Sequence, residues 1–185
     1  MIPAPSSSIG ATAVFMAFIA LTFYGLGAGY LESFVNYPLW YIVGESDRWV
    51  EYHQALGPRV VLVLAIPALL LSLVANALLF VRRPPVVPAW TVTATLSLLL
   101  VGTVSTLAIQ LPLQTALDVA YDRTAIDRLI SSSLWLRDVP GGMRAAIAAY
   151  MLHLVVSDAG LAAAYTRPQA SSVLPGIRPT RPRRT

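Results

Sequence analysis

The sequence contains no cysteine and no lysine. Without cysteine it cannot form disulfides, thiolate metal sites or cysteine nucleophiles, and without lysine it cannot form a Schiff base. Charged residues make up only 12% of its 185 residues, and 56% are hydrophobic. A soluble domain usually carries about 25% charged residues. The composition therefore indicates one domain embedded in a membrane.

The formal net charge of +4 does not indicate a nucleic-acid partner. Five of the arginines lie in the last nineteen residues: Arg167, Arg178, Arg181, Arg183 and Arg184. The excess charge is therefore a property of the tail rather than of a binding face. Residues 167–185 are rich in proline and arginine, and we expect them to form a disordered basic tail.

Long uncharged stretches are what the sequence has in abundance. Three of them cover residues 9–30, 60–81 and 84–117, and a spanning helix needs about 20 apolar residues. A fourth stretch contains Arg144, His153 and Asp158 around the apolar sequence AAIAAYMLHLVV. We predict a transmembrane domain over residues 9–166, after an N-terminal tail of residues 1–8, with spans at about 9–34, 57–82, 87–115 and 142–165.

Residues 123–136 have the pattern of an amphipathic helix. Apolar residues recur there at helical spacing, opposite Asp127 and Arg128: Ile126, Leu129, Ile130, Leu134 and Trp135. We expect this helix to lie on the membrane surface or to cap the bundle, in the loop before the fourth span. The predicted fold class is all-α, an integral membrane four-helix transmembrane bundle.

Arginine placement predicts the orientation of the spans. Arg82 and Arg83 form a short basic loop, and the C-terminal tail is basic, so we expect both termini in the cytoplasm of a cell-membrane protein. The N-terminus lacks the cationic residues of a signal peptide, and we expect the first span to be retained. All four tryptophans, Trp40, Trp49, Trp90 and Trp135, fall in loops or near predicted interfaces, where indole rings favour the boundary.

Polar side chains gather at the outward ends of the predicted spans. Glu32 and Asn36 close the first span, His53 and Arg59 open the second, Gln110, Gln114 and Asp118 close the third, and Arg137 and Arg144 flank the start of the fourth. Polar groups at membrane depth are costly and usually functional. The sequence therefore predicts a site at the outward face, with the helix around Trp135 as a lid and His153 as a floor.

The polar stripe on the third span has two interpretations. Thr106, Gln110, Gln114 and Asp118 follow one another at intervals of four, which places them on one helix face, although Pro112 distorts the helix locally. The stripe either binds a ligand or holds neighbouring helices together.

Glu32 and His153 also have structural alternatives. Glu32 follows a stretch of uncharged residues, so it is either a desolvated group that transfers protons or an interfacial carboxylate paired with Arg59 or Arg144. His153 is either a functional group near mid-depth or a hydrogen-bonded packing residue.

The two histidines do not suit a haem. His153 lies nine residues beyond Arg144, which is about 13 Å deeper at about 1.5 Å per residue, whereas His53 lies near the outer boundary. A bis-histidine haem needs both ligands at comparable depth. The sequence also contains no HxxxH or HxxE pair, and a metal site normally uses three or more ligands. We predict neither haem nor metal.

Four segments carry a resemblance to a known family. In order they are FVNYPLW, WVEYHQALGPR, QLPLQTALD and DRLISSSLWLRDVPGGMRA, and together they resemble the anthrone-oxygenase-like family of small four-helix membrane proteins. The resemblance covers roughly residues 10–165. The matching positions are Asn36, Pro38, His53, Arg59, Pro112, Gln114, Trp135, Arg137 and Arg144. Some fungal members are linked to oxidation of anthrones in polyketide pathways, so the resemblance implies a membrane enzyme with its site at the outer helix ends.

The favoured hypothesis is an enzyme that acts on a lipophilic small molecule of polyketide or terpenoid type. A base (His53, His153 or Glu32) would remove a proton, and Arg59 and Arg144, with Gln114, would stabilise the oxyanion. The carbanion would then react with oxygen, isomerise or cyclise without a cofactor. The predicted substrate-binding residues are Asn36, Gln110, Gln114, Asp118, Trp135, Arg137 and Arg144. The alternative is a non-catalytic membrane protein that binds a lipid or hydrophobic ligand or assists a partner, and a homo-oligomer is compatible with both.

Overall fold

The computed structural model describes residues 6–166, and over this range it confirms the all-α bundle. Within that range four helices are long and apolar enough to cross a membrane: Gly10–Val43, Trp49–Arg82, Ala89–Leu117 and Arg123–Ala159. The protein is therefore a multi-pass membrane protein by fold. The basic tail predicted at 167–185 and residues 1–5 of the predicted N-terminal tail lie outside the described residues.

Each long helix consists of two α-helical parts joined by a π-helical segment, in which the backbone turn is wider. The first contains α1 (Ser6–Leu31), a π segment (Glu32–Asn36) and α2 (Tyr37–Val43). The second contains α3 (Trp49–Val60), a π segment (Val61–Leu71) and α4 (Ser72–Arg82). The third contains α5 (Ala89–Ser105), a π segment (Thr106–Gln110) and α6 (Leu111–Leu117); the fourth contains α7 (Arg123–Ser133), a π segment (Leu134–Asp138) and α8 (Val139–Thr166).

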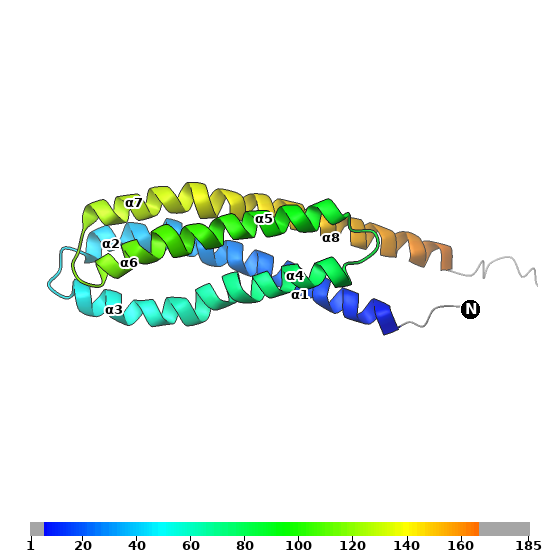
Figure 1. Cartoon of the computed structure of the whole chain (residues 1–185), viewed down its shortest axis with the longest axis horizontal. Helices are drawn as coiled ribbons and strands as arrows, with labels where there is room; N and C mark the ends of the chain where they lie inside the picture. Colours follow the sequence, from blue (N-terminus) through cyan, green and yellow to red (C-terminus); the bar gives the residue numbers. More distant parts are fainter. Residues whose placement is uncertain (1–5, 167–185) are drawn as a thin grey trace, which may run out of the picture.

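The helices form an up-down-up-down bundle (Figure 1). α1 packs against α4 and α8, and α5 packs against the same two helices, so that all neighbours in the ring are antiparallel. The start of α1, the turn between α4 and α5 and the end of α8 lie at one end, which we call the termini end. The loops at 44–48 and 118–122 lie at the other, which we call the loop end.

Proline accounts for the π segments. Three of them, within the described range, end two residues before Pro38, Pro112 or Pro140, and the fourth contains Pro67. A proline has no N–H and its ring crowds the carbonyl four residues earlier. A wider turn relieves that clash without ending the helix. The distortion predicted at Pro112 is confirmed. The second helix also contains Pro58, which lies within α3 without a π segment before it, and all four helices continue past their prolines.

Because the helices continue past their prolines, they are longer at the loop end than the sequence predicted. The first runs to Val43 instead of ending near residue 34, and the second begins at Trp49 instead of near residue 57. Each of these two helices has 34 residues and is about 51 Å long at about 1.5 Å per residue. The hydrocarbon core of a bilayer is about 30 Å thick. The bundle therefore extends well beyond the hydrocarbon.

The amphipathic helix predicted at 123–136 is present as α7, but its placement differs from the prediction. Asp122 caps it, accepting a hydrogen bond from the backbone N–H of Thr124 at 2.8 Å. Its apolar face is buried at Ile126 and Leu129, because α7 packs against α2 and α6. It then passes through the π segment into α8 without a loop. α7 is thus the first part of the fourth long helix and does not lie on the membrane surface.

In the described part of the chain, two apolar cores follow one another along the bundle. The core toward the termini end, which we call the membrane core, contains Phe15, Phe18, Ile19, Ala75, Leu79, Val87, Val92, Ala148 and Met151. The core toward the loop end, which we call the aromatic core, contains Tyr37, Trp40, Trp49, Leu117, Ala125, Ile126 and Leu129. The helix segments between the two cores carry most of the polar side chains that line the cavity described below.

Exposed tryptophans mark two levels along the bundle. Trp90 is 58% exposed and Trp135 is 67% exposed, and Trp90 stacks on Tyr150 with 6.3 Å between ring centroids. Tyr150 lies fifteen residues from Trp135 on the same helix, about 22 Å along the axis. Indole rings favour membrane boundaries, but this separation is shorter than a hydrocarbon core of about 30 Å, so the two rings do not mark both of its boundaries. Trp40 and Trp49 are instead buried in the aromatic core, which corrects the interfacial placement predicted for them.

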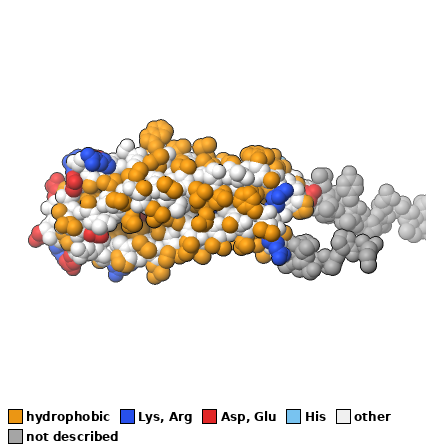
Figure 2. All heavy atoms as spheres, in the orientation of Figure 1, with side chains coloured by type: hydrophobic (Ala, Val, Ile, Leu, Met, Phe, Trp, Pro, Cys, Tyr) orange, Lys and Arg blue, Asp and Glu red, His pale blue; other side chains and the backbone are white. Residues whose placement is uncertain are grey.

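The surface of the bundle is apolar in its middle and charged at its ends. On the face shown in Figure 2, hydrophobic side chains cover the middle of the bundle, and most of the charged side chains gather at the loop end. Arg82 and Arg83 are exposed at the termini end.

The loop end is closed by a contact that requires glycine at position 44. A Cβ atom built on Gly44 would lie 1.9 Å from Cε2 of Tyr121, whose ring packs edge-on against Trp49 with 5.3 Å between centroids. We expect Gly44→Ala to displace that ring and to lower the free energy of unfolding by about 2 kcal/mol. The measurement is the midpoint of thermal unfolding in detergent.

Gly57→Ala is the matched control for this substitution. No atom lies within 4 Å of a Cβ built on Gly57, and alanine has the higher helix propensity. We therefore expect its unfolding midpoint to be unchanged or higher. If Gly44→Ala also left the midpoint unchanged, the close packing of Tyr121 on Gly44 would be refuted.

Candidate functional site

A cavity of about 120 Å³ lies between the membrane core and the aromatic core, with walls from all four long helices. Its walls are largely apolar, with Leu64, Ala68 and Leu98 among them. The polar side chains that line it are Thr22, Tyr30, Glu32, Thr106, Arg137, Asp138 and Arg144. Two carboxyl groups and two guanidinium groups therefore share one cavity.

The π segments supply four of these polar residues. Glu32 begins the π segment of the first helix, Thr106 begins that of the third, and Arg137 and Asp138 end that of the fourth. A π turn inserts an extra residue and so changes the direction of nearby side chains, and π-bulges are frequent at functional sites. The local distortions caused by proline therefore position the polar side of the cavity.

Glu32 is buried, with 5% of its surface exposed. Its Oε1 accepts a hydrogen bond of 2.8 Å from Nδ2 of Asn36, one turn along the same helix. Among the described residues Glu32 forms no ion pair, so the predicted alternative of pairing with Arg59 or Arg144 is not observed. Glu32 is a buried carboxyl group held in place by a neutral neighbour.

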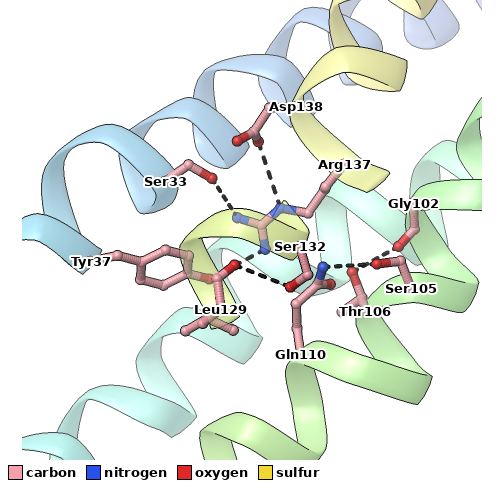
Figure 3. Close-up of polar contacts among 10 residues, drawn as sticks. All are labelled: Ser33, Tyr37, Gly102, Ser105, Thr106, Gln110, Leu129, Ser132, Arg137 and Asp138. Atoms are coloured by element: carbon pink, nitrogen blue, oxygen red, sulfur yellow. Dashed lines mark hydrogen bonds and ion pairs between the residues drawn. The ribbon is translucent and has the colours of Figure 1, made fainter. Parts of the chain in front are cut away.

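Arg137 connects the first and fourth helices at the edge of the cavity (Figure 3). Its Nη2 donates to Oγ of Ser33 at 3.1 Å, and its Nη1 donates to the Tyr37 hydroxyl at 3.4 Å. Its Nε lies 3.8 Å from Oδ1 of Asp138 in an ion pair, and its guanidinium lies over the Tyr37 ring at 5.8 Å. Arg137 therefore links the cavity to the aromatic core.

Asp138 is a site residue that our sequence analysis did not identify. Only 3% of its side chain is exposed, and it lines the cavity beside Arg137. The sequence contains a signal that would have found it. Asn36, Gln110 and Asp138 each stand two residues before a proline, so a polar residue followed by any residue and proline recurs in three of the four long helices.

Arg144 is a buried cation in this cavity without a carboxylate partner. It is 5% exposed, and its Cζ lies 5.5 Å from the centroid of the Phe18 ring. Within the described part of the chain its Nε and Nη2 have no hydrogen-bond partner, and it forms no ion pair. Buried charges are normally paired or hydrogen-bonded. An oxygen atom of a ligand would therefore interact favourably with Arg144.

The polar stripe on the third helix makes mostly local contacts. The buried Gln110 donates from Nε2 to Oγ of Ser105 at 2.8 Å, and Thr106 donates to the carbonyl of Gly102 at 2.9 Å (Figure 3). Thr106 lines the cavity, whereas Gln110 and the half-buried Gln114 do not. Substrate binding by the two glutamines stays a prediction.

His53 lies in the aromatic core and not at the cavity. Its Nδ1 is 2.7 Å from Oδ1 of Asp118, and its ring stacks on Trp49 with 5.1 Å between centroids. Trp49 in turn donates from Nε1 to the carbonyl of Leu117 at 2.9 Å. The pair formed by His53 and Asp118 therefore joins α3 to the end of α6. His53 is seven residues before Val60, the residue of α3 that lines the cavity, which is about two helical turns.

Three other predicted site residues lie on the outside of the bundle. Arg59 is exposed, and its guanidinium donates to the carbonyl of Ala55 on its own helix. His153 is exposed on α8, and Trp135 is exposed on the π segment before it. None of the three lines the cavity. The predicted floor and lid are therefore absent from this cavity, and the group of residues predicted as one site occupies separate locations.

Among residues 10–159 the structure contains no group of three histidine, cysteine, aspartate or glutamate side chains that could hold a metal ion. Comparisons of the chain with protein-family models, with curated proteins and with solved structures find no match. The fold and the site alone define the class: a four-helix membrane bundle with a charged cavity between two apolar cores.

Proposed function

We propose that the protein is a membrane-embedded enzyme that acts on a lipophilic small molecule of polyketide or terpenoid type, by acid–base chemistry that needs no cofactor. The observation that carries the proposal is that one cavity contains both a group that can accept a proton and a group that can stabilise an oxyanion. Glu32 is a buried carboxyl group and Arg144 is a buried guanidinium without a carboxylate partner, and both line the same apolar cavity.

The size and position of the cavity favour a substrate that dissolves in the bilayer. A cavity of about 150 Å³ can bind benzene, so the 120 Å³ here suits about one ring or an equivalent aliphatic segment. Tyr30, one of the lining residues, is 39% exposed. A larger substrate would place its reactive part in the cavity while the remainder extends along the helices.

The proposed chemistry begins with proton transfer to Glu32 from an acidic C–H or a phenolic O–H. Asn36 orients the Glu32 carboxylate for this step. The electron pair left on the substrate delocalises onto a carbonyl oxygen, and the N–H groups of Arg144 stabilise the resulting oxyanion. Return of the proton from Glu32 to another carbon gives an isomer. Attack of the carbanion on a carbonyl carbon of the same molecule gives a ring, and the resulting alkoxide takes the proton from Glu32. With molecular oxygen as the oxidant, the carbanion gives a peroxide anion that takes the same proton, and loss of water from the hydroperoxide gives a carbonyl product.

The resemblance to the anthrone-oxygenase-like family favours a polyketide-like substrate and makes oxygenation one of the candidate reactions. The segments that carry it include FVNYPLW and the sequence from Asp127 to Ala145. They contain Asn36, which contacts Glu32, and also Arg137 and Arg144, which line the cavity.

We also propose that the protein lies in the cell membrane with both termini in the cytoplasm and the loop end outside. Arg82 and Arg83 support this orientation, because they are exposed in the short turn at the termini end and basic loops favour the cytoplasmic side.

The alternative is a non-catalytic membrane protein that binds a lipid or hydrophobic ligand or assists a partner. The contacts of Arg137 favour this alternative, because bonds to Ser33 and Tyr37 tie two helices together and need no reaction to explain them. A homo-oligomer is compatible with either function.

The test compares the metabolites of cells that naturally make the protein when they carry the wild type, Arg144→Gln or Arg144→Lys. We expect Arg144→Gln to lower the amount of product about a hundredfold, because an oxyanion donor is lost. Arg144→Lys retains the charge and should lose less. Products are measured by mass spectrometry of cell extracts and normalised to the protein in the membrane fraction.

Arg82→Gln is the control, because Arg82 is exposed at the opposite end of the bundle. If all variants accumulate in the membrane and leave the metabolites unchanged, the protein is not the proposed enzyme and the non-catalytic alternative is favoured.

A further inference from the structure

The cavity between the two apolar cores is open on one side. Its enclosed part is about 120 Å³, whereas the space within its walls is about 810 Å³ when the open part is included. The second helix supplies one wall through its π segment, Val61–Leu71, and no residue of this segment is buried. Leu64, Ala65 and Leu98 line the cavity but are only half-buried. The wall formed by the second and third helices therefore also faces the outside of the bundle.

The second and third helices are joined at both ends of this wall but not along it. Toward the loop end, Gln54 donates from Nε2 to the carbonyl of Asp118 at 2.9 Å. Toward the termini end, Asn76 donates from Nδ2 to Oγ1 of Thr95 at 3.1 Å. Gln54 and Asn76 are 22 residues apart, about 33 Å along a helix. Within the described part of the chain, no hydrogen bond joins the two helices between these positions.

Between these two links each helix packs against a different neighbour. Outside its own helix, the π segment of the second helix packs mainly against α1, where the Tyr24 hydroxyl donates to the carbonyl of Val63. On the third helix, α5 packs against the π segment of the fourth helix, and the π segment of the third helix packs against α7. The contact between the second and third helices is therefore weakest beside the cavity.

Glycine residues allow close packing on two of the other sides. A Cβ atom built on Gly25 would lie 3.5 Å from Cβ of Ala68, so the first and second helices are in contact at the cavity. A Cβ atom built on Gly102 would lie 3.8 Å from the carbonyl oxygen of Leu136, so the third and fourth helices are in contact as well.

Tyr30 closes the side between the first and fourth helices. Its side chain lines the cavity, and a Cβ atom built on Gly142 would lie 3.1 Å from its hydroxyl oxygen. Next to it, a Cβ atom built on Gly141 would lie 3.7 Å from Cδ1 of Leu26. Three sides of the cavity are therefore closed, and the opening lies between the second and third helices.

The opening is apolar, whereas the cavity behind it is charged. The π segment has the sequence VLVLAIPALLL, without a polar residue, and such a segment suits the hydrocarbon of a bilayer. Among the described residues that line the cavity from the second and third helices, only Thr106 is polar, and its hydroxyl donates to the carbonyl of Gly102. Farther in, Nε and Nη2 of the buried Arg144 have no hydrogen-bond partner. A guanidinium group is a preferred partner for a carboxylate.

We propose that the ligand of this cavity enters from the bilayer between the second and third long helices. The ligand is an amphiphile with one apolar chain or ring system and an acidic oxygen group as its head. The head binds Arg144, and the apolar part stays in the opening along Leu64, Ala65 and Leu98. This inference rests on the proposed function in one respect, that the cavity takes a lipophilic molecule, and it adds the route and the head group of that molecule.

The test is photolabelling of the full chain in vesicles of dioleoylphosphatidylcholine with a small phenyldiazirine that dissolves in the bilayer. Light releases N₂ from the diazirine, the resulting carbene inserts into nearby C–H bonds, and mass spectrometry of peptides locates the label. We expect labels on Leu64, Ala65 and Leu98, and added oleate should reduce them. Labelling of Val74, which is exposed on the second helix outside the cavity, should not change.

Further arms test the head group and the route. 1-Octadecene has a chain of the same length without a carboxylate and should not protect these positions. Arg144→Gln should need about tenfold more oleate for the same protection, because a charge-assisted hydrogen bond is lost. Ala65→Phe narrows the opening and should weaken the protection of Leu98. Ala77→Phe is the matched control, because Ala77 is exposed on the same helix outside the cavity, and it should behave as the wild type does.

Labels on Leu64, Ala65 and Leu98 that are as weak as those on the buried Leu79 would show a closed wall and overturn the entrance. Unchanged protection in Ala65→Phe would overturn it too. Equal protection by 1-octadecene and oleate, or unchanged protection in Arg144→Gln, would overturn the acidic head. None of these outcomes depends on product formation. If oleate protects as expected while the metabolites of Arg144→Gln cells are unchanged, the entrance and its ligand stand and the proposed enzyme fails.

Discussion

Glu32→Gln is expected to lower product formation roughly a hundred- to ten-thousandfold, the range lost when a general base is removed. Glutamine has nearly the same shape as glutamate, and its side-chain carbonyl can still accept the hydrogen bond that Asn36 now donates to Glu32. The substitution therefore removes the proton acceptor while it leaves the π segment and the cavity wall intact. Product is measured by mass spectrometry and divided by the amount of protein in the membrane.

Glu45→Gln is the control for this prediction, because Glu45 is an exposed carboxylate in the loop at 44–48. We expect it to retain full activity. If Glu32→Gln kept activity within threefold of the wild type, Glu32 would not be the base. A loss of activity in Glu45→Gln as well would point to an effect on the whole loop end.

Arg137→Met is expected to cost about 2–3 kcal/mol of stability, because it removes one partner of a buried ion pair. Asp138 would lose its ion-pair partner, and Ser33 and Tyr37 would each lose a hydrogen bond from the guanidinium. The measurement is the unfolding transition in a series of mixed detergent solutions, followed by circular dichroism. Arg48→Met is the control, because Arg48 forms an exposed pair with Glu51 at 3.1 Å, and exposed pairs contribute little.

The double variant Arg137→Met with Asp138→Leu separates the two causes of this loss. Apolar residues often replace a buried ion pair without destabilisation, so the double variant should recover most of the stability that Arg137→Met loses. If it is as unstable as Arg137→Met alone, the bonds to Ser33 and Tyr37 account for the loss, and the charge of Asp138 does not.

The sequence was sufficient to predict the fold class and the number of spans, because bilayer thickness imposes a length and a composition on any spanning helix. It was not sufficient to predict the ends of those helices. We placed the end of the first span near residue 34, whereas the helix continues through Pro38 to Val43. Proline usually ends a helix, because its ring crowds the carbonyl group four residues earlier. Here the wider π turn before Pro38 makes room for the ring, and the helix continues. That adjustment depends on packing against neighbouring helices.

The candidate site was predicted in part. Glu32, Arg137 and Arg144 do line one cavity, as their position at the ends of apolar stretches suggested. His53 was predicted with them because it also stands at the outward end of a predicted span. The structure separates it from the cavity because α3 begins at Trp49, before the predicted start of the second span at residue 57, and packs its histidine between Trp40 and Trp49.

The sequence by itself determined that this protein is a four-helix membrane bundle, and that its polar side chains concentrate toward one end. These properties follow from two features that can be read directly from the sequence, namely the length of the apolar stretches and the positions of the charged residues along them. Only the tertiary structure decided which of those side chains share a cavity. Glu32 and Arg144 are 112 residues apart in the sequence and line the same cavity, whereas His153, nine residues after Arg144, is exposed on the outside of α8. The direction in which a side chain points depends on helix rotation and on the π turns, and both are set by packing between helices that are far apart in the sequence.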